Sequence, residues 1–153
     1  MKPVCELNNF FLRNLEVSGA DKIDTKEVSM SCAFDYDLFC HDDDCRQVRM
    51  VLRVMVGPDN DEENQTCPYE IKAEIEGFFA FSDELSDKQM GYLIRVNSMT
   101  ILYGILRGEI ANVTGSFPSG KFLLPTVMMQ DVVKEIEGRK SKALKALKAI
   151  GSE

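Results

Sequence analysis

The chain has 153 residues, a net charge of −7 and a sequence pI near 4.8. Its length suits one domain, 1–153, with a core of its own. The acidic balance argues against a general nucleic-acid binder, because phosphate contacts need clustered Lys and Arg. The first residues lead into no apolar signal core, and no apolar run approaches the length of a membrane span. We therefore expect a cytoplasmic protein with no nucleic-acid partner and no membrane insertion.

The N-terminal part of the chain predicts two strands. Residues 10–17, FFLRNLEV, predict the first, with Phe11, Leu15 and Val17 on one side. A polar crossover follows, from about residue 18 to 26. The second strand is longer, because apolar residues alternate with polar ones over residues 28–38. Its apolar face holds Val28, Met30, Cys32, Phe34, Tyr36 and Leu38.

The segment from Cys40 to Cys45, CHDDDC, is a cluster with metal-like chemistry. Two thiolates, an imidazole and three carboxylates could hold zinc, but a closed zinc site usually draws paired ligands from a second loop. Cys67 is the lone candidate for that role. Aspartates also suit turns, so the segment favours a hairpin tip. The five cysteines are an odd number without small-scaffold spacing, which indicates free thiols in a reducing compartment.

Two more strands follow. Residues 48–56 alternate, with Met50, Leu52, Val54 and Val56 on one face, and residues 69–76 alternate strictly before a Phe-rich end at 78–81. The acidic loop between them, 57–68, lacks the Gly and Glu spacing of an EF-hand, which argues against calcium.

The rest of the chain predicts two helices. Residues 86–114 carry an apolar stripe, with a candidate break near 97–98 and an end at Gly115, a suitable position for a left-handed residue. Prolines keep the segment around residues 122–125 out of helix. The last helix begins at about Gln130, is loosened at Gly138, and continues as a basic tail over 139–153. This tail suits a solvated or docking helix better than a nucleic-acid arm.

These elements predict an α+β fold: a four-stranded antiparallel sheet, followed by two helices packed on one face. Because the strands follow one another with turns between them, the sequence also predicts a meander.

Catalytic motifs are absent from the sequence. His41 is the single histidine and sits in an acid-rich turn, so a Ser-His-Asp set could form only if His41 reached across the fold. The Ser119-Gly120-Lys121 turn lacks the spacing of a phosphate-binding loop. We expect no enzyme activity, no cofactor and no metal.

The stretch from Tyr69 to Met129 resembles the export chaperone SecB and the SecB-like proteins. The resemblance is carried by an EIE-G-FF strand end, an amphipathic segment, N-x-x-x-I-L before the main helix, then T-G-x-F-P and L-L-P-x-V. It extends more loosely upstream to about Leu7. It implies an ATP-independent chaperone, assembled as a dimer of dimers, that holds unfolded polypeptides in exposed apolar grooves. Methionine is an adaptable lining for such grooves, and the chain has 8.

The resemblance also implies where the groove lies, between the second strand and the C-terminal helix. The matching positions are Val28, Met30, Cys32 and Phe34 on the strand, Leu124, Val127 and Met128 on the loop, and Val132, Val133 and Ile136 on the helix. Ordinary core is the alternative for these residues. Leu102, Leu106 and Ile110 are expected either in the core or in an oligomer interface.

The clients would be preproteins for export or an unstable antitoxin. Export members dock SecA through acidic residues of the first and fourth strands, where this chain has Asn14, Ser18 and Lys72. The acidic tail of some members is replaced here by the basic segment 139–148. SecA is therefore a doubtful partner, and a chaperone for a toxin-antitoxin system is the alternative within the family. Outside it, the alternatives are a scaffold domain that keeps the fold without the groove, and a small-ligand binder.

Overall fold

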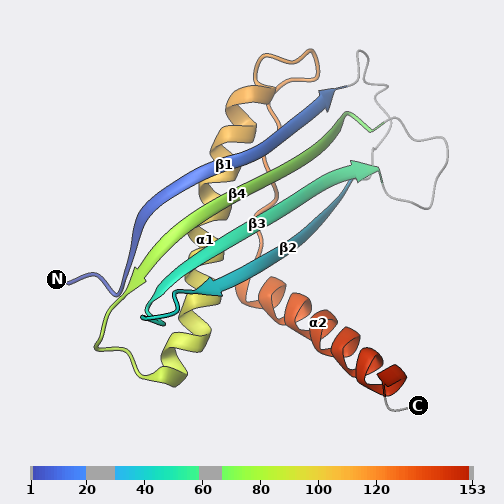
Figure 1. Cartoon of the computed structure of the whole chain (residues 1–153). Coiled ribbons are helices and arrows are strands. Elements are labelled where there is room, and N and C mark those ends of the chain that lie inside the picture. The colour runs from blue at the N-terminus through green and yellow to red at the C-terminus, as the bar shows by residue number, and fades with distance from the viewer. Residues whose placement is uncertain (1, 20–29, 59–66, 152–153) are drawn as a thin grey trace.

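The computed structural model describes residues 2–19, 30–58 and 67–151. They form one antiparallel sheet followed by two helices, as predicted (Figure 1). The elements are β1 (Cys5–Gly19), β2 (Met30–Cys40), β3 (Gln47–Pro58), β4 (Tyr69–Phe81), α1 (Asp87–Thr114) and α2 (Met129–Gly151). The first two residues of the predicted crossover, Ser18 and Gly19, belong to β1, and the rest of it and most of the predicted acidic loop fall outside the described residues.

The order of the strands corrects the predicted meander. The sheet runs β1-β4-β3-β2, so that only β2, β3 and β4 follow one another in space as they do in sequence. β1 instead pairs with β4, from Cys5 opposite Phe81 to Gly19 opposite Tyr69. Turn signals show where strands end, but sequential strands are neighbours only about two-thirds of the time. β2 therefore lies at an end of the sheet.

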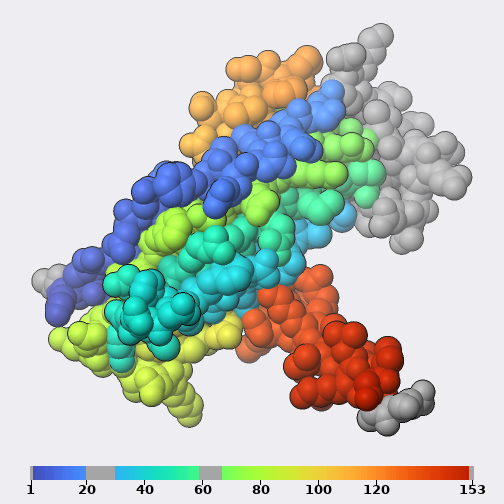
Figure 2. Space-filling model, in the orientation of Figure 1, coloured from blue at the N-terminus to red at the C-terminus, as the bar shows by residue number. Residues whose placement is uncertain are grey.

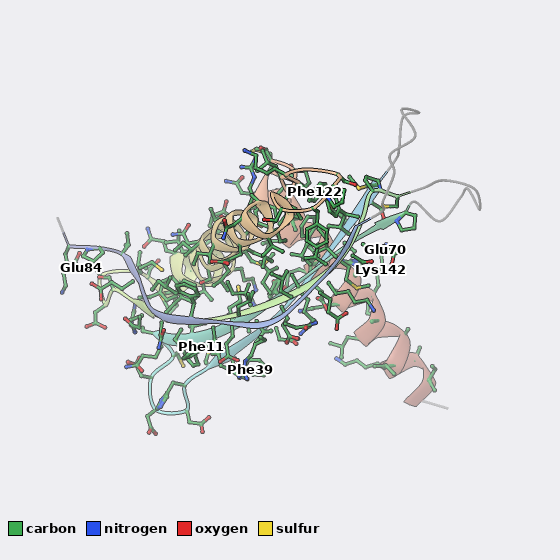
Figure 3. The ribbon with its side chains drawn as sticks, turned by 90° about the horizontal axis from the view of Figure 1, so that it is seen from above. Phe11, Phe39, Glu70, Glu84, Phe122 and Lys142 are labelled. Atoms are coloured by element: carbon green, nitrogen blue, oxygen red, sulfur yellow. The ribbon has the colours of Figure 1, made fainter. Side chains whose placement is uncertain are left out.

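β1 is longer than predicted and changes the face that its side chains occupy. Its pairing with β4 shifts register between Leu7 and Asn9 and again between Leu12 and Asn14. An extra residue in one strand moves the following side chains to the other face. Phe11 therefore lies on the sheet face opposite α1 (Figure 3), edge-on to Phe78 with ring centroids 6.2 Å apart. Its predicted place beside Leu15 and Val17 is wrong, because those two residues lie beyond the second shift and pack on the core.

The core lies between the sheet and α1. The predicted faces of β3 and β4 are buried, and α1 covers them with the predicted stripe (Figure 1). The side chains with 0% exposure include Met50, Leu52, Val54, Ile75, Met99, Leu102, Leu106 and Ile110. Burying a large aliphatic side chain stabilises the fold by about 1.5–3 kcal/mol, so this layer dominates the stability of the protein.

α1 is one continuous helix, without the candidate break at 97–98. It begins with a capping box, in which Ser86 and Gln89 satisfy each other's backbone N–H groups. At its end Gly115 is right-handed, with φ −58°, because its N–H still bonds back to the carbonyl of Ala111. The left-handed residue is Gly120, with φ 81°. The prediction of a left-handed residue at Gly115 is therefore wrong.

The segment of residues 120–128 is not helical, as the prolines predicted, and is fastened to α1. The hydroxyl of Thr114 accepts a bond from the N–H of Phe122 at 2.8 Å, and Leu124 is fully buried. α2 then runs without interruption through Gly138, where the sequence predicted a loosening. It begins on the α1 side of the sheet and projects past the β2 edge (Figure 1). Its second half stands clear of the sheet in Figure 2.

Candidate functional site

The candidate site lies where the end strand β2 meets the first half of α2. The partly buried apolar side chains of β2 are Met30, Cys32, Phe34 and Leu38, and the first three are predicted groove residues. Phe34 packs edge-on against Tyr103 of α1, with ring centroids 5.6 Å apart. The Tyr103 hydroxyl in turn donates to the carbonyl of Pro125 at 2.5 Å. This chain of contacts fixes the position of the 122–128 segment relative to β2.

Some of the predicted groove residues are buried and others are accessible to solvent. Leu124, Val133 and Ile136 are sealed in the core, with exposures of 0%, 8% and 2%. Met128 is 67% exposed, and five others are half-buried: Met30, Cys32, Phe34, Val127 and Val132. Val28 lies outside the described residues. A client can touch only exposed atoms, so the accessible residues are those available to one.

The predicted oligomer-interface residues are also buried and cannot contact another chain. Leu102, Leu106 and Ile110 have 0% exposure within this one chain. They hold α1 on the sheet, which agrees with the core alternative, and they have no surface left for a second copy. The interface assignment for these side chains is therefore corrected. The side of α1 that faces away from the sheet has half-buried Ile101 and Ile105 beside exposed Gly104 and Gly108.

A polar clasp, which the sequence analysis missed, fastens α2 to β2 and α1. It consists of Tyr36, Arg95, Glu137, Arg139 and Lys140. The Tyr36 hydroxyl donates to Oε1 of Glu137, and Nε of Arg95 donates to the same oxygen at 3.3 Å. Burial and the bond to Glu137 raise the pKa of Tyr36, whereas the bond from Tyr36, with help from Arg95, lowers the pKa of Glu137. The carboxylate is thus held charged at the helix-strand junction.

The other half of the clasp reaches the backbone of β2. Nη2 of Arg139 donates to the carbonyl of Phe34 at 3.0 Å, and Nζ of Lys140 donates to the carbonyl of Tyr36 at 2.5 Å. Lys140 also lies 4.3 Å from the centre of the Tyr36 ring. The basic residues that follow the apolar edge of α2 were a usable sequence signal. Their partners could not be found that way, because the partners are main-chain atoms.

The titratable groups of the site do not favour nucleophilic chemistry. Burial raises the pKa of Cys32, and burial together with the nearby Cys32 raises the pKa of Tyr103 to about 12. A thiol is a nucleophile only as the thiolate, so this thiol is a weak one. The site is suited to apolar and hydrogen-bond contacts.

The Cys40–Cys45 segment forms the tip of the β2-β3 hairpin, as the turn alternative predicted. The backbone N–H of His41 bonds to Gln47 O at 2.9 Å, and Nδ1 of His41 accepts from the N–H of Asp43 at 3.2 Å. Within residues 2–19, 30–58 and 67–151, no three His, Cys, Asp or Glu side chains gather closely enough to hold a metal ion. Neither α1 nor α2 is long and apolar enough to cross a membrane.

Comparison with solved structures places the fold. The chain matches the Rv1957 SecB-like chaperone of Mycobacterium tuberculosis, solved in complex with a ChAD peptide from the Rv1956 HigA1 antitoxin. The TM-score is 0.62 at 10% identity, over 81% of this chain and 91% of that one. A protein of unknown function from Streptococcus agalactiae matches with a TM-score of 0.45 at 12% identity, over 80% of this chain and 97% of that one.

Sequence comparison adds nothing to this match, because neither a family model nor a curated protein matches the chain. The chain therefore has a SecB-like fold, as its motifs predicted.

Proposed function

We propose that this protein is an ATP-independent chaperone that holds unfolded polypeptides on the apolar surface between β2 and the first half of α2. One observation carries the proposal. Six apolar side chains from three segments remain half-buried or exposed at this one junction: Met30, Cys32, Phe34, Val127, Met128 and Val132. Apolar side chains that stay partly exposed together at one place on a protein support a site for another chain. Two of the six are methionines, which adapt to clients of different shape.

The client class is best described as an unstable antitoxin rather than an export preprotein. At the positions that the resemblance assigns to SecA docking, the chain has Asn14, Ser18 and Lys72 instead of acidic residues. Asn14 and Lys72 line one shallow hollow on the sheet, together with Arg53. Glu74 lines the same hollow and Arg53 is paired with Asp35 and Asp37, so it is the lack of acidic residues at positions 14, 18 and 72, and not a net positive charge, that disfavours a basic docking partner. The Mycobacterium tuberculosis neighbour was itself solved with an antitoxin peptide, which supports the same direction.

The assembly we propose is a homo-oligomer, a dimer of dimers. Since the sheet side of α1 is filled by the chain's own core, another copy would have to meet other surface, such as the side with Ile101 and Ile105. Light scattering coupled to size exclusion measures this directly, and a monomer at micromolar concentration would contradict it.

An aggregation assay tests the proposed function. The protein is added at equimolar ratio to an unrelated denatured protein without nucleotide, and light scattering follows aggregation. We expect suppression by the wild type and loss of suppression in the double variant Met30→Asp with Met128→Asp. A bound client would bury the new carboxylates without partners, which costs free energy.

The matched control is Met55→Asp. Met55 is 53% exposed and lies on the sheet face opposite α1, so the same chemical change there should leave suppression intact. If wild type does not suppress aggregation, the protein is better described as a scaffold domain. Direct binding measurements with SecA and with an antitoxin peptide separate the two pathways.

A further inference from the structure

The edge of β2 that faces away from β3 has no strand beside it among the described residues. β3 is the one strand that pairs with β2 in the described part of the chain. In an antiparallel strand, alternate residues direct both their N–H and their C=O to the same side. The carbonyls of Phe34 and Tyr36 are bonded by Arg139 and Lys140, so they point away from β3. By the same alternation, the backbone groups of Met30 and Cys32 point away from β3 too.

These residues also carry the candidate client surface. The side chains of Met30, Cys32 and Phe34 are on the α1 side of the sheet and pack against the core. The same residues thus direct backbone hydrogen-bonding groups to the edge, where Arg139 occupies the carbonyl of Phe34, and place apolar side chains beside it. A chain lying along this edge would meet both at once. Every second side chain of such a strand would face the side that holds Val127 and Val132.

We infer that a client binds as an added β-strand on the edge of β2, with its N–H groups replacing the side chains of Arg139 and Lys140 on the carbonyls of Phe34 and Tyr36. The inference rests on the proposed function and specifies how the client is held. The occupant is an extended segment of an unfolded polypeptide with apolar residues at alternate positions. Main-chain pairing is the same for every sequence, which is what a site for unrelated clients requires.

The side chains of Arg139 and Lys140 can give way to the N–H groups of a client. Arg139 and Lys140 are exposed, long and flexible, so they can leave the carbonyls and return to solvent without moving the helix backbone. When no client is bound, they cover an edge that would otherwise pair with other chains. Lysine beside an edge strand is a common protection against such pairing. The two cations therefore act as placeholders at the strand-pairing positions.

Backbone methylation of a peptide tests strand pairing without changing side chains. The probe is a fluorescent peptide of alternating leucine and threonine, together with two isomers methylated on the amide nitrogens of one or the other alternate set. In a paired strand, one alternate set of peptide N–H groups points to β2 and the other set points away from it. Strand pairing therefore predicts that the isomer methylated on the set facing β2 binds at least about tenfold more weakly than the unmodified peptide. The other isomer should bind like the unmodified peptide.

The outcomes separate the inference from the function on which it rests. If the unmodified peptide binds and the two isomers bind alike, whether strongly or weakly, strand pairing is overturned while the chaperone function stands. If none of the three binds, the proposed function fails as well.

A variant pair supplies the second measurement. Arg139→Ala with Lys140→Ala should strengthen binding of the unmodified peptide several-fold, because the carbonyls no longer need to be vacated. The matched control is Lys142→Ala with Lys145→Ala. This pair removes the same formal charge, but from the exposed half of α2, and should not strengthen binding. Equal effects of the two pairs would indicate general electrostatics and would overturn the placeholder role.

Discussion

The two helices of this protein are held in contrasting ways. α1 has 28 residues, ten of them buried, and lies along the sheet, whereas α2 has 23 residues and buries three, Met129, Val133 and Ile136. α2 depends on this small apolar contact and on the polar clasp. Stability differs across a fold in this way, and segments with few buried contacts open first. The contrast places the proposed client site beside the more weakly held helix.

A second contrast lies within α2. Leu144, Leu147 and Ile150 continue the apolar spacing of its first half, yet they are 55%, 67% and 74% exposed. In its first half, β2 and α1 lie opposite the helix, and in its second half no described part of the chain does (Figures 1 and 2). An apolar stripe on a helix therefore shows which side could be buried, and the surrounding structure decides whether it is.

The largest effect is expected from Leu102→Ala in α1. Leu102 has 0% exposure and packs against the sheet, so the variant loses burial and leaves a cavity. We expect the free energy of unfolding to fall by about 2–5 kcal/mol. Urea denaturation followed by circular dichroism measures it. A loss below about 1 kcal/mol would contradict the core role of this side of α1.

A smaller and more local effect is expected from Ile136→Ala. Ile136 is 2% exposed, but α2 has only three buried residues, so we expect it to detach while the sheet and α1 stay folded. The loss should be about 2 kcal/mol at most and should appear in α2 first. Hydrogen exchange measures this as faster exchange of α2 amides with unchanged exchange in β3 and β4. Equal loss of protection in all elements would show that α2 is part of one cooperative core.

Glu137→Gln tests the clasp through pH. The bond from Tyr36 lowers the pKa of Glu137 below its ordinary value of 4.5. A lowered pKa means that the charged carboxylate stabilises the fold fully above the unfolded-state pKa and that this contribution is lost as pH falls through the folded-state pKa. The side chain is 42% exposed, so solvent screening limits the effect to about 0.5–1 kcal/mol.

The measurement compares α2 hydrogen exchange in wild type and variant at neutral pH and at pH below 4.5. We expect a difference at neutral pH that shrinks in acid. A difference that is the same at both pH values would mean that the carboxylate charge does not hold α2.

The smallest effect is expected from Leu147→Ala, the counterpart of Ile136→Ala in the exposed half of the helix. Leu147 is 67% exposed, so truncation removes little buried area. The free energy of unfolding should change by less than about 0.5 kcal/mol. A larger loss in an oligomeric sample, together with a lower mass by light scattering, would reveal a partner surface on this half.

The way in which the candidate site is fastened could not be predicted from the sequence. The resemblance placed Met30, Cys32 and Phe34, with Val132, Val133 and Ile136, at the proposed groove, whereas alternation and helical spacing indicated only which side of each element is apolar. The bond between Tyr36 and Glu137 joins residues 101 positions apart. The sequence offers no local pattern for such a contact, because each partner is an ordinary polar residue in its own segment.

By itself, the sequence determined which segments are strands and helices and which face of β3, β4 and α1 enters the core, because local periodicity carries that information. Only the tertiary structure decided that β1 joins β4, that Phe11 faces away from α1, and that Leu147 is exposed while Ile136 is buried. These outcomes depend on what lies opposite each side chain. A neighbour that is distant in sequence leaves no mark on the pattern of the segment that it covers.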